Sequence, residues 1–409
     1  MAATEPGSFR DRDSRVVVSD DAIYRALSPE GAEDWEAFSG SPLLEQLTAA
    51  GKVIGTREVD PSVLGESQDL LPTGITKVLE HDRVPFVSYP YEWTFSMLQD
   101  AAKLQLELGA AAIDSGLDLK DATPYNVQFI GSQPTFIDIG SFEKITEGEP
   151  WIAYRQFCML YLYPLLFQAH KDIPFHPWMR GSIDGIQPID AIKVFSLRDR
   201  LRRGVFLHTS LHARLDRRAN KSGPGSAEEN KTKRQVKPGQ IKAQLESMNR
   251  LVSKLKWKAG ETSWSGYRQS NTYSDEDDRR KQAFVGEVAA QLKPGLTWDM
   301  GCNDGAYSRI AAESSERVVA FDFDHATVEA LYRSLREEGN TKILPLVSNL
   351  ADPSPALGWR GQCHCRRRRT SGRCSVRRTS TRSRASSSRS GRTSGCSTSS
   401  TRPRRPWTR

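Results

Sequence analysis

Apolar and polar positions along the first 120 residues predict a mixture of strands and helices. Residues 15–18 (RVVV) and 86–88 are short β-type runs, and residues 43–50 have the pattern of a short amphipathic helix. Apolar side chains then recur every three or four positions, which predicts one long helix over residues 94–115. The N-terminal part of the chain is therefore expected to be an α+β domain.

The pattern then changes to a hairpin, to helices and finally to a polar stretch. Two short apolar runs, residues 127–130 and 135–139, are separated by Gly-Ser-Gln-Pro, a turn sequence typical of a β-hairpin. Residues 151–215 are mostly helical in pattern. Residues 216–240 have almost no apolar side chains and contain several glycines and prolines, which is typical of a solvated linker.

After the linker, helix and strand patterns alternate. An amphipathic helix from residue 241 precedes three helix–strand pairs: 281–292 and 296–300, 306–312 and 318–321, 326–337 and 343–347. Strands that alternate with helices predict a parallel sheet with helices packed on it. The predicted fold class is therefore α/β: a partial Rossmann-like, doubly wound parallel sheet in the C-terminal part, joined to the α+β N-terminal domain.

Charge separates residues 361–409 from the rest of the chain. The formal net charge is +8, but residues 361–409 contain 15 Arg and no Lys, Asp or Glu, which leaves −7 for residues 1–360. They also contain no Leu, Ile, Met, Phe or Tyr, so they cannot bury a core. We expect a disordered basic tail whose composition is typical of a coding sequence read in another frame. An Arg-rich nucleic-acid-binding tail is the alternative.

The remaining composition predicts a cytoplasmic protein without a membrane partner. Residues 1–360 contain only Cys158 and Cys302, which is the cysteine usage of a reducing compartment. The N-terminus lacks the apolar stretch of a signal peptide, and the longest apolar run, residues 157–167, is too short to span a bilayer. Apart from the tail, no feature of charge favours a nucleic-acid partner.

A candidate nucleoside site lies where the first strand of the C-terminal domain ends. Asp299 precedes the turn Gly301-Cys302-Asn303-Asp304-Gly305, and Asp322 ends the next predicted strand 23 residues after Asp299. Glycines permit a tight turn and a close approach of ligand to backbone, and an acid at this spacing is placed to accept both ribose hydroxyls. Asp299 would repel a pyrophosphate but attract the ammonium group of a methionine moiety.

The segments DMGCNDG and VVAFDFD resemble motifs I and II of class I S-adenosylmethionine (SAM)-dependent methyltransferases, and the resemblance covers roughly residues 270–360. It implies SAM as the cofactor, with Asp299 near the methionine amino group and Asp322 on the ribose. The other cofactor-binding residues that it implies are Gly301, Asn303, Gly305, Asn349 and Leu350. Many members have glycine where this chain has Asn303, but asparagine tolerates left-handed backbone angles. Another nucleotide-binding fold, or a structural α/β unit, is the alternative.

A second candidate site consists of Asp121, Asn126 and Asp138. Phosphoryl transfer needs a carboxylate at the attacking hydroxyl, and an amide and a second carboxylate on magnesium. The segment resembles the catalytic and metal-binding loops of the aminoglycoside phosphotransferase and protein kinase-like superfamily, which implies Asp121 as the catalytic residue and Asn126 and Asp138 as Mg²⁺ ligands. Lys120 precedes Asp121 without the histidine of that family, and no Gly-rich phosphate loop or strand lysine is recognisable. An Asx-rich turn is the alternative.

Together these patterns predict a kinase-like domain over residues 1–215, a linker over 216–240, the N-terminal half of a SAM-binding methyltransferase domain over 241–360 and a basic tail over 361–409. The predicted function is SAM-dependent methyl transfer to an unidentified acceptor, with a small-molecule or carbohydrate substrate. Because such a sheet normally has further strands, we expect this chain to be impaired as a methyltransferase. The alternatives are a small-molecule or carbohydrate phosphotransferase with an accessory nucleotide-binding domain, and a nucleic-acid binder that acts through its tail.

Overall fold

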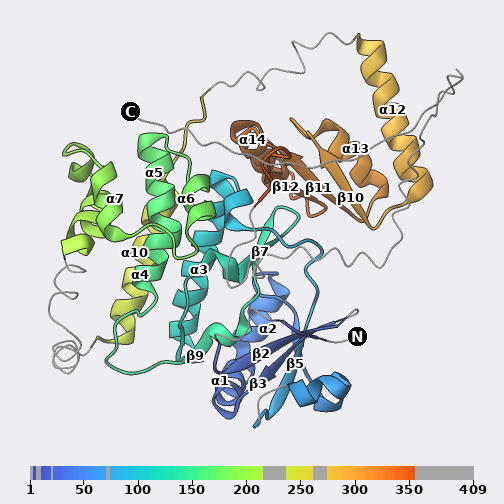
Figure 1. Ribbon diagram of the computed structural model, residues 1–409. Coiled ribbons are helices and arrows are strands. Elements are labelled where there is room, and N and C mark those ends of the chain that lie inside the picture. The colour runs from blue at the N-terminus through green and yellow to red at the C-terminus, as the bar shows by residue number, and fades with distance from the viewer. Residues whose placement is uncertain are drawn as a thin grey trace, which may run out of the picture. The chain divides into compact units, whose positions relative to one another are not determined.

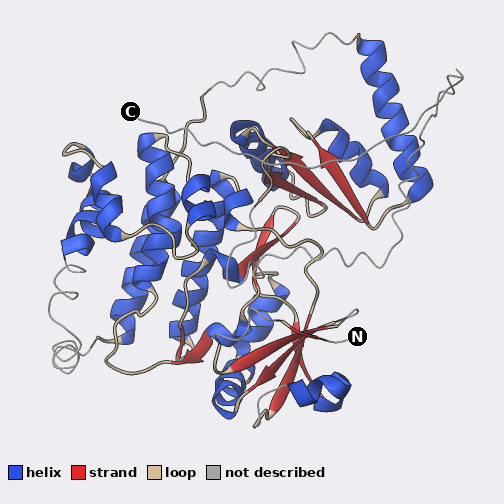
Figure 2. Ribbon diagram, in the orientation of Figure 1, coloured by secondary structure: helices blue, strands red, loops and turns tan. Residues whose placement is uncertain are grey.

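A computed structural model of the chain (Figure 1) describes residues 3–5, 11–19, 22–70, 74–214, 236–260 and 274–354. Helices and strands are mixed throughout these ranges, in agreement with the predicted α/β class (Figure 2). Residues Met1–Cys365 cluster as one compact unit. The tail predicted over 361–409 and most of the predicted linker lie outside the described residues. None of the described helices is long and apolar enough to cross a membrane.

The N-terminal part contains a five-stranded antiparallel sheet. In spatial order its strands are β1 (Ala3–Thr4), β2 (Ser14–Val18), β3 (Ile23–Leu27), β5 (Lys77–His81) and β4 (Thr56–Val59). Between β3 and β4 lie α1 (Pro29–Ser39) and α2 (Pro42–Ala49), each of which begins with a serine N-cap followed by proline. The predicted strand at 15–18 and helix at 43–50 are confirmed as β2 and α2, whereas the sequence pattern did not indicate β3, β4, β5 or α1.

Helix α3 (Phe95–Asp114) confirms the long helix predicted over 94–115 and lies at the centre of the main core. A second helix, α10 (Pro238–Lys254), packs along it. Gly109 of α3 permits this close approach, because a Cβ there would lie only 3.3 Å from the side chain of Leu245. The amphipathic helix that follows the predicted linker is therefore packed on α3, not on the C-terminal sheet, and its first turn includes residues 238–240.

A hairpin and a series of short helices follow α3. Strands β7 (Val127–Ile130) and β8 (Gln133–Phe136) confirm the predicted hairpin, and β6 (Leu117–Leu119) pairs with β9 (Phe142–Lys144). The helices are α4 (Tyr154–Phe157), α5 (Tyr163–Lys171), α6 (His176–Gly181), α7 (Pro188–Val194) and α8 (Arg203–Val205). A π-helical segment joins α4 to α5, which confirms residues 157–167 as a buried helix.

The strand predicted over residues 86–88 is wrong, and the reason lies in a side chain. The amide group of Gln128 accepts a hydrogen bond from the backbone N–H of Ser88 at 2.9 Å and donates one to its carbonyl oxygen at 3.0 Å. These bonds satisfy both backbone groups of Ser88 without a neighbouring strand. Phe86 packs edge-on against the rings of Trp298 and Phe321 in the C-terminal sheet, so its apolar character serves tertiary packing.

The C-terminal sheet has three parallel strands in the order β10 (Leu296–Met300), β11 (Arg317–Asp322) and β12 (Ile343–Val347). Its helices are α12 (Asp275–Leu292), α13 (Ala306–Ser314) and α14 (His325–Glu337). All six elements were predicted. Successive strand residues face opposite sides. Val318 and Ala320 pack with residues of α13 and α14, whereas Val319 and Phe321 belong to the main core with residues of the N-terminal part.

The outer edge of β10 differs from the rest of this sheet. Leu296, Trp298 and Met300 are 40%, 45% and 55% exposed, and within the described ranges no strand pairs with this side of β10. An edge of this kind offers unpaired backbone groups and apolar side chains to any neighbouring chain. Within the described residues β12 also has no strand on its outer side, but its side chains and those of β11 are mostly buried, whereas alternate side chains of β10 are exposed.

Candidate functional site

The turn after β10 owes its shape to three residues with left-handed backbone angles. Gly301 has φ 95°, Asn303 has φ 46° and Gly305 has φ 76°. Asn303 thus adopts the conformation that its replacement of glycine requires. The N–H groups of Gly301 and Cys302 donate to the carbonyl oxygen of Phe321 at 2.8 and 3.0 Å. These bonds fix the turn against the end of β11.

Asp322, at the end of β11, is in direct contact with this turn. One carboxylate oxygen accepts a hydrogen bond from the backbone N–H of Asn303 at 3.0 Å, and the other accepts one from the N–H of Asp324 at 3.0 Å. The side chain is half-buried. The structure therefore brings together the predicted ribose-binding acid and the predicted glycine turn, and neutral N–H groups are the partners that orient the acid.

Asp299 lies beneath the turn, on the side of α13. Its carboxylate accepts a hydrogen bond from the Ser308 hydroxyl at 2.6 Å. Burial raises the pKa of Asp299 above its ordinary value; the Ser308 bond acts in the opposite direction, and the charge of Asp322 adds to the rise. Burial and the charges of Asp299 and Asp322 also raise the pKa of the Cys302 thiol. The site therefore has a negative potential, which favours a cationic ligand group over an anionic one.

Asn349 and Leu350 follow β12 at the same edge of the sheet. The backbone N–H of Ser348 donates to the carbonyl oxygen of Asp322 at 2.7 Å, which places the start of this loop beside the end of β11. The Asn349 side chain accepts from the N–H of Ala351 at 2.9 Å, and Leu350 is 58% exposed. The loop that carries these two residues thus begins beside Asp322.

A cavity of 260 Å³ opens between the turn and α14. Asn303 and Asp304 line it on one side and α14 residues, including Thr327, on the other. Thr327 is 6% exposed, and its hydroxyl oxygen has no hydrogen-bond partner within the described part of the chain. Thr327 therefore contributes to the wall of the cavity, but its hydroxyl oxygen is enclosed.

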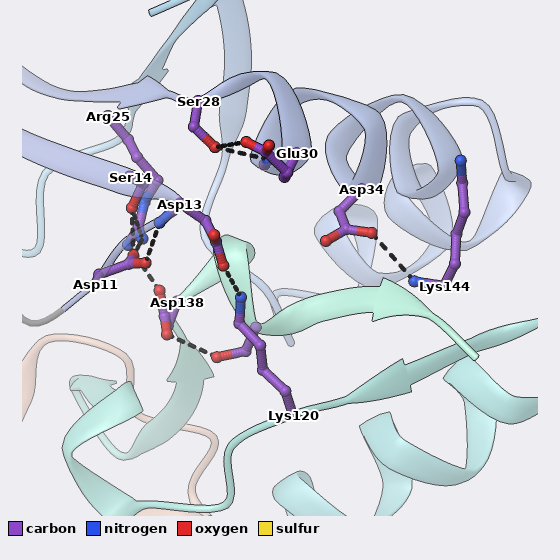
Figure 3. A network of polar contacts seen from close by, with 12 residues as sticks. Asp11, Asp13, Ser14, Arg25, Ser28, Glu30, Asp34, Lys120, Asp138 and Lys144 are labelled. Atoms are coloured by element: carbon purple, nitrogen blue, oxygen red, sulfur yellow. Dashed lines mark hydrogen bonds and ion pairs between the residues drawn. The ribbon is translucent and has the colours of Figure 1, made fainter. Parts of the chain in front are cut away.

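The second predicted site is assembled around Asp138. The Asn126 amide donates to one of its oxygens at 3.2 Å, and the Ser141 hydroxyl donates to the same oxygen at 2.6 Å. Arg25 of β3 binds the other oxygen at 2.7 Å (Figure 3). Both oxygens of Asp138 are therefore already engaged, and one of the partners is a cation.

The surrounding polar network ties the N-terminal sheet to the same loops (Figure 3). Arg25 also donates to the Ser14 hydroxyl at 3.0 Å and lies 3.7 Å from Asp11. Lys120 forms an ion pair with Asp13 at 3.0 Å. The side chain of Arg25 is 10% exposed, so its ion pair with Asp138 is the enclosed part of this network. The side chain of Asp13 is 41% exposed, so its pair with Lys120 lies nearer the solvent.

Asp121 is half-buried beside this network. Burial raises its pKa, and the negative charge of Asp138 raises it further, whereas the charge of Lys120 lowers it. The structure thus places Asp121 close enough to Asp138 for their charges to interact. Across the residues that the structure describes, no group of three or more His, Cys, Asp and Glu side chains is arranged to hold a metal ion.

Four residues of these sites were not found from the sequence: Arg25, Ser308, Thr327 and Ser141. Of the four, only Ser308 could have been found from the sequence. It lies in the first turn of the predicted helix α13, from where a side chain can reach back to β10. Arg25 had none, because its partner lies on a distant segment that only the fold brings near.

Comparisons with known proteins place the chain in a family. No family model matches it. Nodulation protein NoeA of Rhizobium meliloti (strain 1021) is 35% identical to it over 356 residues, which is 86% of this chain and 73% of that protein. Similarity of this degree over most of both sequences means that the chain belongs to the family of nodulation protein NoeA.

Proposed function

We propose that the turn Gly301–Gly305 and Asp322 bind SAM, and that the C-terminal part is the cofactor-binding half of a class I methyltransferase of Rossmann-like fold. The observation that carries the proposal is the contact between Asp322 and the backbone of Asn303 at the carboxyl ends of two adjacent parallel strands. Ligands of open parallel sheets bind at this edge. Its two hydrogen-bond donors are neutral N–H groups, so neither brings a positive charge to the carboxylate.

The residues present fit the cofactor in charge and in space. Asp299 and Asp322 supply a negative potential for the methionine ammonium group, and the same potential disfavours the pyrophosphate of a dinucleotide. Gly301 leaves open space where a side chain would begin. Thr327 lines the adjoining cavity of 260 Å³. Asp322 would hold the ribose hydroxyls, and Asn349 and Leu350 would border the adenine.

SAM, when bound, supplies a methyl group on a positively charged sulfur, which a nucleophile of the acceptor attacks in line. The protein's part in such a reaction is positioning and the exclusion of water. Asp299 would hold the methionine end of the cofactor and Asp322 its ribose, and the Gly301–Gly305 turn would bring it against the backbone. We propose that the methyl acceptor is a small molecule or a carbohydrate.

Phosphoryl transfer by a kinase-like N-terminal domain is the second candidate function. The contact between Asn126 and Asp138 favours it, because these are the two side chains that would bind Mg²⁺. The Arg25 ion pair argues against it, since the guanidinium group occupies the oxygen of Asp138 that a metal ion would need. We therefore assign the N-terminal part a non-catalytic role and keep methyl transfer as the proposed function.

Isothermal titration calorimetry with the full chain tests the assignment. We expect SAM and S-adenosylhomocysteine each to bind at one site per chain, and NAD not to bind, because Asp299 disfavours a pyrophosphate. Titration with ATP and Mg²⁺ addresses the second candidate. Binding of NAD in place of SAM would overturn the proposal in favour of a dinucleotide site, and Mg²⁺-dependent binding of ATP would restore phosphoryl transfer.

A further inference from the structure

Helix α14 links the proposed nucleoside site to the N-terminal part of the chain. It begins at His325, directly after its N-cap Asp324. Asp324 accepts a hydrogen bond from the N–H of Thr327 at 3.0 Å, and its own N–H donates to Asp322 at 3.0 Å. One of the two bonds that orient Asp322 therefore comes from the cap of α14. The position of this helix determines where that donor lies.

The other end of this link is the first turn of α3. The first N–H groups of an α-helix have no partner within the helix. Thr94 caps the N–H of Met97 at 3.3 Å. The N–H of Phe95 donates instead to Nε2 of His325 at 3.1 Å, and the N–H of Ser96 donates to Glu329 at 3.0 Å. Side chains of α14 thus accept hydrogen bonds from the N–H groups of Phe95 and Ser96, which Thr94 does not cap.

Glu329 makes the stronger contact with α3, and His325 the weaker one. Its second carboxylate oxygen accepts from the Ser96 hydroxyl at 2.6 Å, and Arg333 forms an ion pair with it at 2.8 Å. Glu329 is 2% exposed, and a buried carboxylate is costly unless it is fully paired. It also lies at the positive end of the α3 dipole, which stabilises its charge. A displaced α14 would lose both hydrogen bonds between Glu329 and Ser96 together, whereas the Arg333 ion pair lies within α14.

His325 has the ring state that this contact needs. Burial, and then the neighbouring His176, lower the pKa of His325 well below its ordinary value, so the ring is neutral and Nε2 accepts the Phe95 N–H. Nδ1 then carries the ring proton, and the Gln168 amide group, whose nitrogen is placed 3.1 Å from Nδ1, has to present its unpaired oxygen there instead. The Trp257 ring stacks on the imidazole with centroids 4.4 Å apart. His325 and Glu329 are four positions apart and so lie on one face of α14.

We infer that Glu329 and His325 are positioning residues for the nucleoside site, and that the N-terminus of α3 is the platform against which α14, and through it Asp322, is set. The inference rests on the proposed function. It gives the N-terminal part a role in SAM binding that needs no catalysis of its own. Glu329 and Ser96 are 233 positions apart in the sequence, so the link depends on the whole fold.

A double-mutant cycle in the full chain tests the inference, with SAM affinity measured by calorimetry. Glu329→Ala is expected to weaken SAM binding about tenfold in the wild-type background and by less than about twofold when Asp322→Asn is already present. A purely structural effect would be equal in both backgrounds. Glu329→Gln keeps an acceptor for the Ser96 N–H and should restore most of the affinity. Glu337→Ala, on the exposed side of α14, is the matched control.

Ser96→Ala provides a second variant in case Glu329→Ala does not fold. It removes the hydroxyl's bonds to Glu329 and Arg333 but keeps the backbone N–H bond to Glu329, and we expect a loss of about threefold that also disappears with Asp322→Asn. Equal losses in both backgrounds, or wild-type affinity in Glu329→Ala and Ser96→Ala, would overturn the positioning role while leaving the SAM site intact. Absence of SAM binding by the wild type would overturn the proposed function and this inference with it.

Discussion

Asp138 lies just after strand β8 and Asp322 ends strand β11, yet their surroundings differ in charge. Asp138 binds Arg25 at 2.7 Å in addition to two neutral donors. Asp322 binds only the N–H groups of Asn303 and Asp324. Hydrogen bonds from neutral donors orient a carboxylate and leave its charge, whereas an arginine cancels it. Of the two sites, the one at Asp322 therefore retains the negative charge that a ligand could use.

This difference explains why the two sequence motifs have unequal value. Both motifs place acids and amides at spacings that suit a ligand. Such a spacing describes only the residues of the loop itself. It does not report which side chains arrive from elsewhere. The Arg25 contact comes from a strand of the N-terminal sheet, and it turns a possible metal site into a structural ion pair. The ligand that such a motif could bind therefore depends on the side chains that the fold brings to it.

Removal of the Arg25 side chain should have the largest effect of the changes predicted at these two sites. Arg25→Ala leaves Asp138 largely enclosed without its cation, and we expect a loss of about 3 kcal/mol in the free energy of unfolding, measured by urea denaturation. Arg25→Lys, which keeps a positive charge, should lose less. If the freed Asp138 and Asn126 then bind Mg²⁺, millimolar Mg²⁺ would raise the melting temperature of Arg25→Ala but not that of the wild type. Unfolding of Arg25→Ala at the wild-type urea concentration would show that the ion pair is dispensable.

The next largest effect is expected at Asp322, whose carboxylate accepts hydrogen bonds from neutral N–H groups. Asp322→Ala should weaken SAM binding by about 1–3 kcal/mol, because charge-assisted hydrogen bonds to the ribose are lost. Calorimetry provides the measurement. Glu316→Ala, which removes one negative charge just before the amino end of β11, is the control and should bind SAM as the wild type does. Equal affinity in wild type and Asp322→Ala would refute the ribose assignment.

A smaller effect is expected at Asp299. Its pKa is raised above the ordinary value of 3.8, so it takes up a proton at a higher pH than a typical aspartate. The charged form attracts the methionine ammonium group, and SAM affinity should therefore be full at neutral pH and fall as the pH decreases towards this raised pKa. Asp299→Asn should weaken binding by about 1 kcal/mol at neutral pH and flatten the pH dependence. A pH profile of SAM affinity that is unchanged in Asp299→Asn would contradict this role.

The smallest predicted effect tests the turn itself. Asn303→Gly removes the cost of a left-handed backbone at φ 46° but keeps the N–H that binds Asp322. Two terms oppose each other, because glycine also increases the freedom of the unfolded chain, and we expect a net change within about 0.5 kcal/mol in stability. SAM affinity should stay within about twofold of the wild type. A large loss of affinity would mean that the asparagine side chain itself contacts the ligand.

The sequence was sufficient for the elements whose signals are local. Periodic apolar side chains predicted α3 and the alternating elements of the C-terminal sheet, since each pattern reports the face that an element buries. It failed for the strand at 86–88, where a distant glutamine satisfies the backbone of Ser88. Strands β3, β4 and β5 also escaped prediction; their apolar runs are short and broken by charged residues such as Arg25 and Glu58.

The candidate sites also contain some features set by neighbouring residues and others set by contacts with distant segments. The sequence alone determined the Gly301–Gly305 turn and its spacing to Asp322, because a turn and the two strands beside it are set by neighbouring residues. Only the tertiary structure decided that Arg25 binds Asp138 and that Glu329 binds the start of α3. In each case the charge of one side chain is stabilised by a group from a distant segment. Such pairing depends on where the packed elements meet, and no local pattern records it.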